Sequence, residues 1–108
     1  MLHELRIYRA APAKLAALHA RFEQVTLPLW KKHGIQPVGF WTTLIGQSNM
    51  DLTYLLQWAD MADRERRWNA FAGDPEWLEK KAGTEKDGPL VENVTNQLLA
   101  PTAYSPMR

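Results

Sequence analysis

Residues 38–58 read VGFWTTLIGQSNMDLTYLLQW, and this stretch decides the fold. Its two ends, 38–45 and 52–58, are rich in the β-branched and aromatic residues that are typical of strands. Between them, Gly46 to Asn49 consists of residues that favour turns. The stretch therefore predicts a β-hairpin with one strand over 38–45 and the other over 52–58.

Upstream of the hairpin, a strand pattern is followed by a helix pattern. Residues 2–9 alternate between apolar and polar side chains, which predicts a strand. Apolar residues then recur at steps of three and four as far as Leu29, which predicts one face of a helix that ends at Gly34. Pro28 should interrupt this helix, because its ring clashes with the carbonyl four residues back. We expect a kink or a second helix that starts near Thr26, which could cap it.

Downstream of the hairpin, the pattern predicts two helices and one strand. A helix is expected over 62–72, and Asp74-Pro75 is typical of the start of a further short helix. Residues 91–99 form the last strand, followed by an extended tail over 100–108. This order predicts an α+β fold, the ferredoxin-like β-α-β-β-α-β arrangement, with a four-stranded antiparallel sheet and helices on one face.

The composition is that of one small globular domain, residues 1–108, with 45% hydrophobic and 23% charged residues. No apolar run approaches the roughly 18 residues of a membrane span, and no export signal is visible, so we expect a cytoplasmic protein. A net charge of +1 argues against a protein built to hold nucleic acid. The absence of cysteine excludes disulfides and thiol nucleophiles. Tryptophan is unusually frequent, at positions 30, 41, 58, 68 and 77.

Both strands of the hairpin are apolar on both faces. Phe40 and Trp41 point to opposite sides of the first strand, and Leu55 and Leu56 to opposite sides of the second. Helices cover only one face of a ferredoxin-like sheet, so the other face would expose a large apolar patch. We therefore predict a homodimer in which two sheets pack into an eight-stranded barrel with the helices outside.

The first strand carries the most informative polar group. Glu4, Arg6 and Tyr8 alternate with Leu5 and Ile7, so the three share one face. If Leu5 and Ile7 meet the helices, the polar group points into the barrel. Two interpretations stay open: a structural salt bridge between Glu4 and Arg6 that holds the dimer, or the polar end of an apolar ligand pocket. In such a pocket Arg6 would hold an anionic or carbonyl group and Tyr8 would donate a hydrogen bond.

The hairpin supplies further candidates for the same ligand-binding pocket. Tyr54 and Trp58 share one face of their strand, and Trp41 and Thr43 share one face of theirs. A one-residue slip in the pairing exchanges the faces, so whether the two pairs meet stays open. Each of these aromatic residues is also suited to an ordinary core.

The chain shows no motif for a metal or a cofactor. His3, His19 and His33 form no ligand set with one another or with carboxylates. Neither a Gly-x-Ser-x-Gly nucleophile motif nor a phosphate-binding glycine loop is present. A haem would require an axial His near the pocket, and none is well placed. We predict no metal site and no cofactor.

The second helix begins with the charged run DRERR over 63–67. Such a run is typical of a solvated helix face with local ion pairs. The alternative is that Arg64 stacks on Trp68, four residues later, or approaches the sheet.

Several segments together resemble the NIPSNAP family. They span nearly the whole chain in order: ELRIY (4–8), LWKKHG (29–34), VGFWTT (38–43) with Gly46, ADRERR (62–67), DPEW (74–77) and LLAPTAYSP (98–106). The resemblance implies a dimeric α+β barrel, and it implies a bacterial single-domain member for a chain of this length without a presequence.

The resemblance implies little about chemistry. The family has no agreed catalytic residues, and its eukaryotic relatives are associated with mitochondria and vesicle trafficking. Members often carry a His on the third strand in a His-x-Trp alternation. Here Tyr54, Leu56 and Trp58 occupy that alternation, so a general base at this place is absent, unless Tyr54 works as a hydrogen-bond donor instead.

These observations lead to two hypotheses about function. The first is a small-molecule-binding barrel whose pocket takes an apolar or aromatic ligand. Similar barrels host cofactor-independent oxygenation and isomerisation, which is an analogy of fold only and leaves open whether the protein is an enzyme. The alternative is a non-enzymatic stress or trafficking protein that acts through the surface of its dimer.

Overall fold

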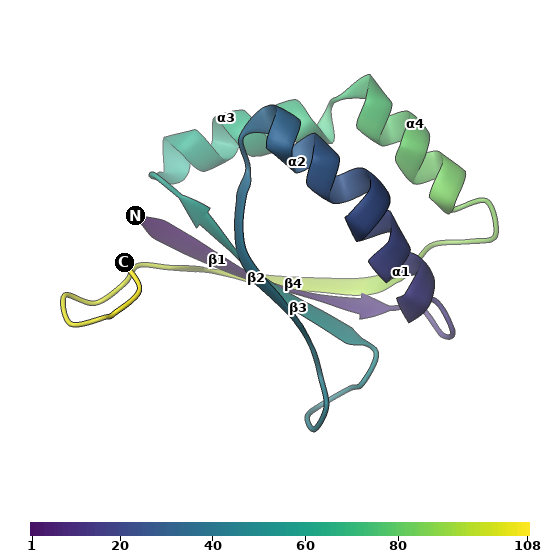
Figure 1. Ribbon diagram of the computed structural model, residues 1–108, viewed down its shortest axis with the longest axis horizontal. Coiled ribbons are helices and arrows are strands. Elements are labelled where there is room, and N and C mark those ends of the chain that lie inside the picture. Colours follow the sequence, from purple (N-terminus) through teal and green to yellow (C-terminus); the bar gives the residue numbers. More distant parts are fainter.

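A computed structural model describes residues 1–108, and it consists of one antiparallel sheet with helices on one side (Figure 1). The sheet has four strands in the order β2-β3-β1-β4. The strands are β1 (Leu2–Ala10), β2 (Gln36–Thr42), β3 (Asp51–Trp58) and β4 (Val91–Leu99). This order and direction confirm the predicted ferredoxin-like arrangement.

The hairpin forms, but its first strand is displaced from the predicted range. Strand β2 ends at Thr42, which pairs with Leu52, and residues 43–50 form the loop. The backbone N–H of Asp51 donates to the Ser48 carbonyl at 3.3 Å, so β3 begins in a turn. Residues 43–45 therefore have no strand to pair with, although their sequence favours a strand. Two apolar side chains in this loop are almost fully exposed, Leu44 at 94% and Ile45 at 100%.

Pro28 interrupts the regular α-helix, as predicted. The interruption is one turn of wider, π-helical backbone. Helix α1 (Leu15–Arg21) continues into a π-helical turn (η1, Phe22–Thr26) and then into α2 (Leu27–His33). In η1 the N–H of Leu27 bonds to the carbonyl of Phe22, five residues back. The wider turn accommodates a proline that has no N–H of its own to donate.

The predicted cap at Thr26 is wrong. Thr26 has helical dihedral angles and its side chain makes no capping hydrogen bond, because the helix passes through it without a break. The end of α2 is as predicted, since Gly34 adopts a left-handed conformation with φ of 71°.

The two later helices begin with acidic caps, of which the one at Asp74 was predicted. Asp60 accepts a hydrogen bond from the N–H of Asp63 at the start of α3 (Met61–Ala72). Asp74 accepts one from the N–H of Glu76 at the start of α4 (Pro75–Thr84), with proline in the first turn. The predicted extended tail over 100–108 is wrong in part, because residues 101–108 form a loop with a turn in which the Ser105 N–H donates to the Thr102 carbonyl at 3.1 Å.

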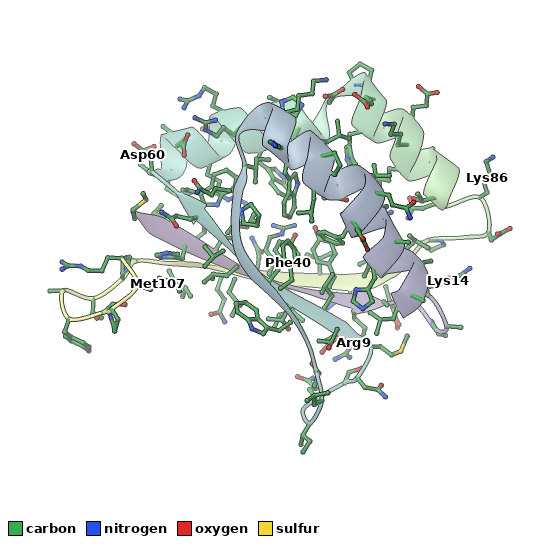
Figure 2. The ribbon with its side chains drawn as sticks, in the orientation of Figure 1. Arg9, Lys14, Phe40, Asp60, Lys86 and Met107 are labelled. Atoms are coloured by element: carbon green, nitrogen blue, oxygen red, sulfur yellow. The ribbon has the colours of Figure 1, made fainter.

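The core lies between the helices and the sheet (Figure 2). Alternate residues of β3, namely Leu52, Tyr54, Leu56 and Trp58, face the helices and are at most 3% exposed. The registers pair Tyr8, Arg6 and Glu4 of β1 with Leu52, Tyr54 and Leu56. The polar group of β1 therefore faces the helices of its own chain, and Leu5 and Ile7 lie on the opposite, open face. Glu4, Arg6 and Tyr8 would point into a barrel between two sheets only if Leu5 and Ile7 met the helices, and Leu5 and Ile7 do not.

Candidate functional site

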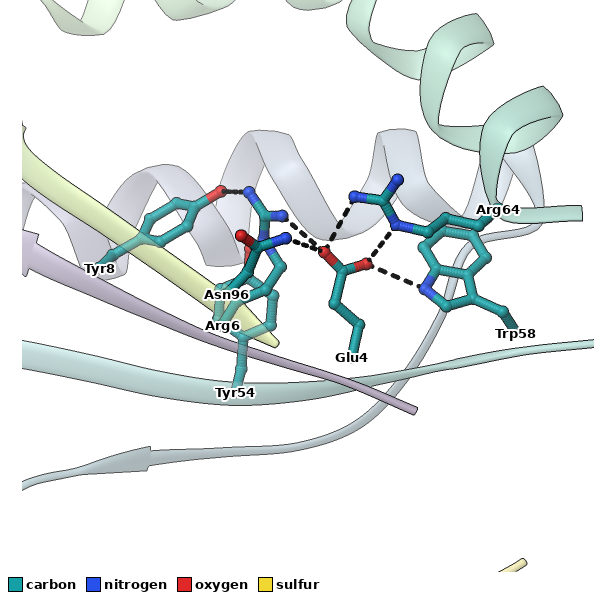
Figure 3. Close-up of polar contacts among 7 residues, drawn as sticks. All are labelled: Glu4, Arg6, Tyr8, Tyr54, Trp58, Arg64 and Asn96. Carbon is teal, nitrogen blue, oxygen red and sulfur yellow. Dashed lines mark hydrogen bonds and ion pairs between the residues drawn. The ribbon is translucent and has the colours of Figure 1, made fainter. Parts of the chain in front are cut away.

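Glu4 is the centre of a buried polar network that joins three strands to α3 (Figure 3). Its carboxylate is fully buried and accepts five hydrogen bonds from four residues. Arg64 donates two, at 2.9 and 3.1 Å, and Arg6 donates one at 2.8 Å. The indole N–H of Trp58 and the amide of Asn96 donate the other two, at 3.0 and 2.9 Å. Strands β1, β3 and β4 and helix α3 thus each contribute at least one donor to the same carboxylate.

Arg6 uses its guanidinium to connect Glu4 with two tyrosines. Its Nε donates to the Tyr54 hydroxyl at 2.7 Å, and its Nη2 donates to the Tyr8 hydroxyl at 3.1 Å. The guanidinium carbon lies 4.5 Å from the centre of the Trp68 ring, a cation–π contact. The position of Arg6 is therefore determined by contacts on all of its nitrogens and on one face.

The electrostatics of this network favour fixed charges over proton transfer. Burial by itself would raise the pKa of Glu4, but the hydrogen bonds from Arg64, Asn96 and Arg6 outweigh it and lower the pKa to about 2. Burial raises the pKa of Tyr54 well above its ordinary value, so its phenol stays neutral. A carboxylate with so low a pKa is a poor base, and the network is suited to holding structure.

A cavity of about 450 Å³ lies beside this network, between the helices and the sheet. It falls within the usual size range for small-molecule pockets. Six aromatic rings line it, contributed by strand β1 and by the π-turn and helices: Tyr8, Phe22, Trp30, Trp68, Phe71 and Trp77. Several of these rings contact one another edge to face, for example Phe22 and Trp30 with centroids 5.7 Å apart. The cavity therefore presents aromatic walls that other aromatic rings already support.

Four polar side chains also line the cavity: Arg21, Thr26, Lys81 and Glu85. Arg21 is only 5% exposed, and its Nη1 makes two long contacts, 3.5 Å to the Thr84 hydroxyl and 3.6 Å to Glu85. Burial lowers the pKa of Arg21, and the charge of Glu85 opposes that effect. The cavity is thus apolar over most of its wall, with a buried positive charge at one place.

The structure brings together five of the seven predicted site residues. Glu4, Arg6, Tyr8, Tyr54 and Trp58 form the network described above, and of these only Tyr8 lines the cavity.

The other two predicted site residues lie elsewhere. Trp41 pairs with Thr53 on the open face and is 52% exposed, and Thr43 is in the hairpin loop. Because Phe40, and not Trp41, pairs with Tyr54, the Tyr54–Trp58 pair and the Trp41–Thr43 pair do not share a face.

Sequence reasoning missed the contribution of the first helix to the cavity. Phe22 and Trp30 fit the expected helix stripe or helix packing, and nothing local marked Arg21 or Thr26 as buried and pocket-lining. The available signal was Pro28, since the π-turn that accommodates it directs Phe22 and Thr26 to the same cavity. π-turns inside α-helices are frequent at functional sites.

The arginines at the charged start of α3 take both of the predicted roles, contact with the sheet and local ion pairs. Arg64 approaches the sheet and binds Glu4, while Arg66 and Arg67 form local ion pairs with Asp63. Of the histidines, His33 contacts Asp74 at 2.7 Å, next to the Lys32–Asp74 ion pair. No group of three or more histidine, aspartate or glutamate side chains is arranged to hold a metal ion.

Comparison with protein families agrees with this architecture. The NIPSNAP family profile matches residues 3–106, nearly the whole chain. This protein belongs to the NIPSNAP family. The resemblance read from the sequence segments is thereby confirmed. A search of curated proteins finds no match. No helix of this NIPSNAP protein is long and apolar enough to cross a membrane.

Solved structures of NIPSNAP proteins are similar to this chain over its full length. Protein Atu4242 from Agrobacterium tumefaciens is 26% identical, with a TM-score of 0.85 and 100% of both chains covered. An uncharacterised NIPSNAP-like domain protein from Burkholderia xenovorans is 28% identical, with a TM-score of 0.84, over 97% of this chain and 88% of that one.

The fold extends to a more distant group. A Nitrosomonas europaea protein proposed to be an antibiotic biosynthesis monooxygenase has a TM-score of 0.63 at 10% identity, covering 94% of this chain and 98% of its own. At that identity the likeness shows the fold alone.

Proposed function

We propose that this NIPSNAP protein binds a small aromatic molecule in the cavity between its helices and its sheet. The observation that carries the proposal is the lining of six aromatic rings around about 450 Å³. Aromatic walls bind planar apolar ligands by area burial and by edge-to-face contacts. The ligand site differs from the one expected from the sequence, which was inside a barrel formed by two sheets.

The proposal concerns binding and assigns no reaction. Glu4 is occupied by five hydrogen bonds and has a pKa of about 2, so it does not serve as a general base. Arg6 and Tyr54 are engaged with each other. We propose that this network supports the wall of the cavity: Arg6 holds the hydroxyl of Tyr8 and stacks on Trp68, and both of those rings line it.

We also propose that the protein forms a homodimer through the open face of its sheet. Leu5 and Ile7 of β1 and Leu55 of β3 lie on this face, and Trp41 of β2 is half exposed beside them. Such a group of apolar side chains on three adjacent strands favours burial against a second copy. In this arrangement the helices and the ligand cavity stay on the outside of the dimer.

The binding proposal is tested with the fluorescent probe N-phenyl-1-naphthylamine, a neutral aromatic amine. Three of the five tryptophans line the cavity, so binding should quench tryptophan emission as well as brighten the dye. A contribution of about 0.3 kcal/mol per non-hydrogen atom predicts a Kd of the order of 0.1 mM for a probe of this size. Protein is therefore titrated into a fixed low concentration of the dye.

Two variants at one position locate the binding. Val94 lines the cavity from β4 and is 45% exposed, so it tolerates a change of size. Val94→Phe adds a bulky ring at the cavity wall and should weaken saturable binding, whereas Val94→Ala should retain it. Equal binding by the wild type and Val94→Phe, or no saturable binding by the wild type, would show that the proposal is wrong.

A further inference from the structure

The polar groups of the cavity wall are unusual because several of them have no partner. Four buried side-chain nitrogen or oxygen atoms lack a hydrogen-bond partner in the protein: His3 Nε2, Arg21 Nε, Thr26 Oγ1 and Trp30 Nε1. Three of these four belong to residues that line the one aromatic cavity, and all three lie on the continuous helix from α1 to α2. Buried polar groups are nearly always paired, so this concentration requires an explanation.

Arg21 is the most demanding member of the group. A buried guanidinium is costly unless it is paired, and its five N–H donors call for several acceptors. Its contacts to Thr84 and Glu85, at 3.5 and 3.6 Å, are longer than those of a well-formed charged hydrogen bond, and Nε has none. The Trp77 ring, 5.7 Å away, packs beside the guanidinium without accepting from its N–H groups in the way an anion does.

The surrounding charges do not supply the missing anion. Of the other residues that line the cavity, Glu85 is the one acidic side chain, and Lys81 adds a further positive charge. Behind the cavity wall, two guanidiniums, Arg6 and Arg64, share the single carboxylate of Glu4. The interior on this side therefore carries a surplus of positive charge that favours an anionic guest.

The π-turn explains how one helix presents these donors together. Arg21 and Thr26 are five residues apart, the spacing that π-helical hydrogen bonds span, and both are buried and line the cavity. Trp30 follows one α-helical turn after Thr26 and is 1% exposed. Three residues from successive turns of one helix thus line the same cavity, and the unpaired polar atoms of Arg21, Thr26 and Trp30 are buried in its wall.

We infer that the molecule bound in the cavity is an aromatic acid, whose carboxylate or sulfonate group is held by the guanidinium of Arg21. This inference rests on the proposed function and names the ligand class for the same site. The aromatic body of the ligand contacts the rings, and its acidic group supplies the close anionic partner that the Arg21 guanidinium lacks. The cavity therefore prefers the acid to a neutral aromatic molecule of the same shape. This preference is stronger than the hydrophobicity of the two molecules alone predicts.

The test compares two probes that share one skeleton. 1-Anilinonaphthalene-8-sulfonate carries a sulfonate, and N-phenyl-1-naphthylamine is the same molecule without it. The measured quantity is the ratio of their Kd values, sulfonate over neutral, for each variant. Arg21→Met keeps a long side chain and removes the charge, so the ratio should rise about ten- to hundredfold while the Kd of the neutral probe changes little.

Two further variants make the result specific. Glu85→Gln removes the competing carboxylate beside Arg21, so the ratio should fall about threefold or more, a change opposite in direction to that of Arg21→Met. Arg66→Met deletes the same charge on an exposed part of α3 that does not line the cavity, and should leave the ratio unchanged. If Arg21→Met fails to fold, Glu85→Gln still decides the question.

The possible failures are distinguishable. If the neutral probe does not bind the wild type saturably, the proposed function itself is wrong. If the neutral probe binds and Val94→Phe weakens its binding, but the ratio is the same in the wild type, Arg21→Met and Glu85→Gln, then the cavity binds aromatic molecules without recognising an acid. That result would overturn the present inference alone.

Discussion

Replacing Glu4 by glutamine should destabilise the fold strongly, because it leaves Arg6 and Arg64 buried around a neutral group. The carboxylate is fully buried and accepts hydrogen bonds from both guanidiniums. Removing one partner from a buried ion pair costs about 3–5 kcal/mol. A separate estimate comes from the pKa of Glu4, which is about 2 instead of 4.5. That difference corresponds to roughly 3 kcal/mol, in agreement with the first figure.

The pH dependence provides a sharper check than the magnitude. The pKa of Glu4 is depressed in the folded state, so its contribution to stability is present above about pH 5 and is lost as the pH falls towards 2. Glutamine resembles a protonated glutamate. The difference in unfolding free energy between the wild type and Glu4→Gln should therefore be about 3 kcal/mol at pH 6 and shrink towards zero near pH 2.

Urea denaturation followed by tryptophan fluorescence measures this difference at fixed protein concentration. Other carboxylates with lowered pKa values, such as Asp63, also make the wild type less stable in acid, but their effects cancel in the difference. Glu79→Gln, at an exposed position on α4, serves as the control and should change stability by less than about 0.5 kcal/mol. A loss below about 1 kcal/mol at pH 6 for Glu4→Gln, or a loss that does not vary with pH, would refute the reasoning.

Two further predictions concern assembly and backbone conformation. Light scattering should give the wild type twice its chain mass of 12.4 kDa, and Leu55→Lys on the open face should give the single-chain mass; a monomeric wild type would exclude the dimer. Gly34→Ala should lower the unfolding free energy by about 1–2 kcal/mol, since its φ of 71° is strained for a side chain and the added methyl group would also displace the Arg67 guanidinium. Gly83→Ala, where nothing lies within 4 Å of the added methyl group and the conformation is helical, should instead stabilise by about 0.5–1 kcal/mol, so equal effects at the two glycines would contradict this explanation.

Local patterns in the sequence were sufficient for the elements of the fold and for several of their ends. The alternation in β1, the turn residues before β3, the Asp74-Pro75 start of α4 and Gly34 at the end of α2 all behave as predicted. These features depend on backbone geometry and on hydrogen bonds within a few residues, which the sequence displays directly. Pro28 likewise predicted an interruption, although not that the helix would continue through a π-turn.

The candidate site depended on contacts that only the tertiary structure makes. Alternation placed Glu4, Arg6 and Tyr8 on one face of a strand, but both faces of this sheet carry apolar residues, so the pattern did not say which face meets the helices. The choice follows from long-range partners: Glu4 is held by Arg64, 60 residues away, and by Asn96, 92 residues away. A buried carboxylate is stable only where such donors converge. The sequence by itself determined which elements form and which residues share a face, while the packing of distant elements decided which face is buried, where the cavity lies, and that Arg21 lines it.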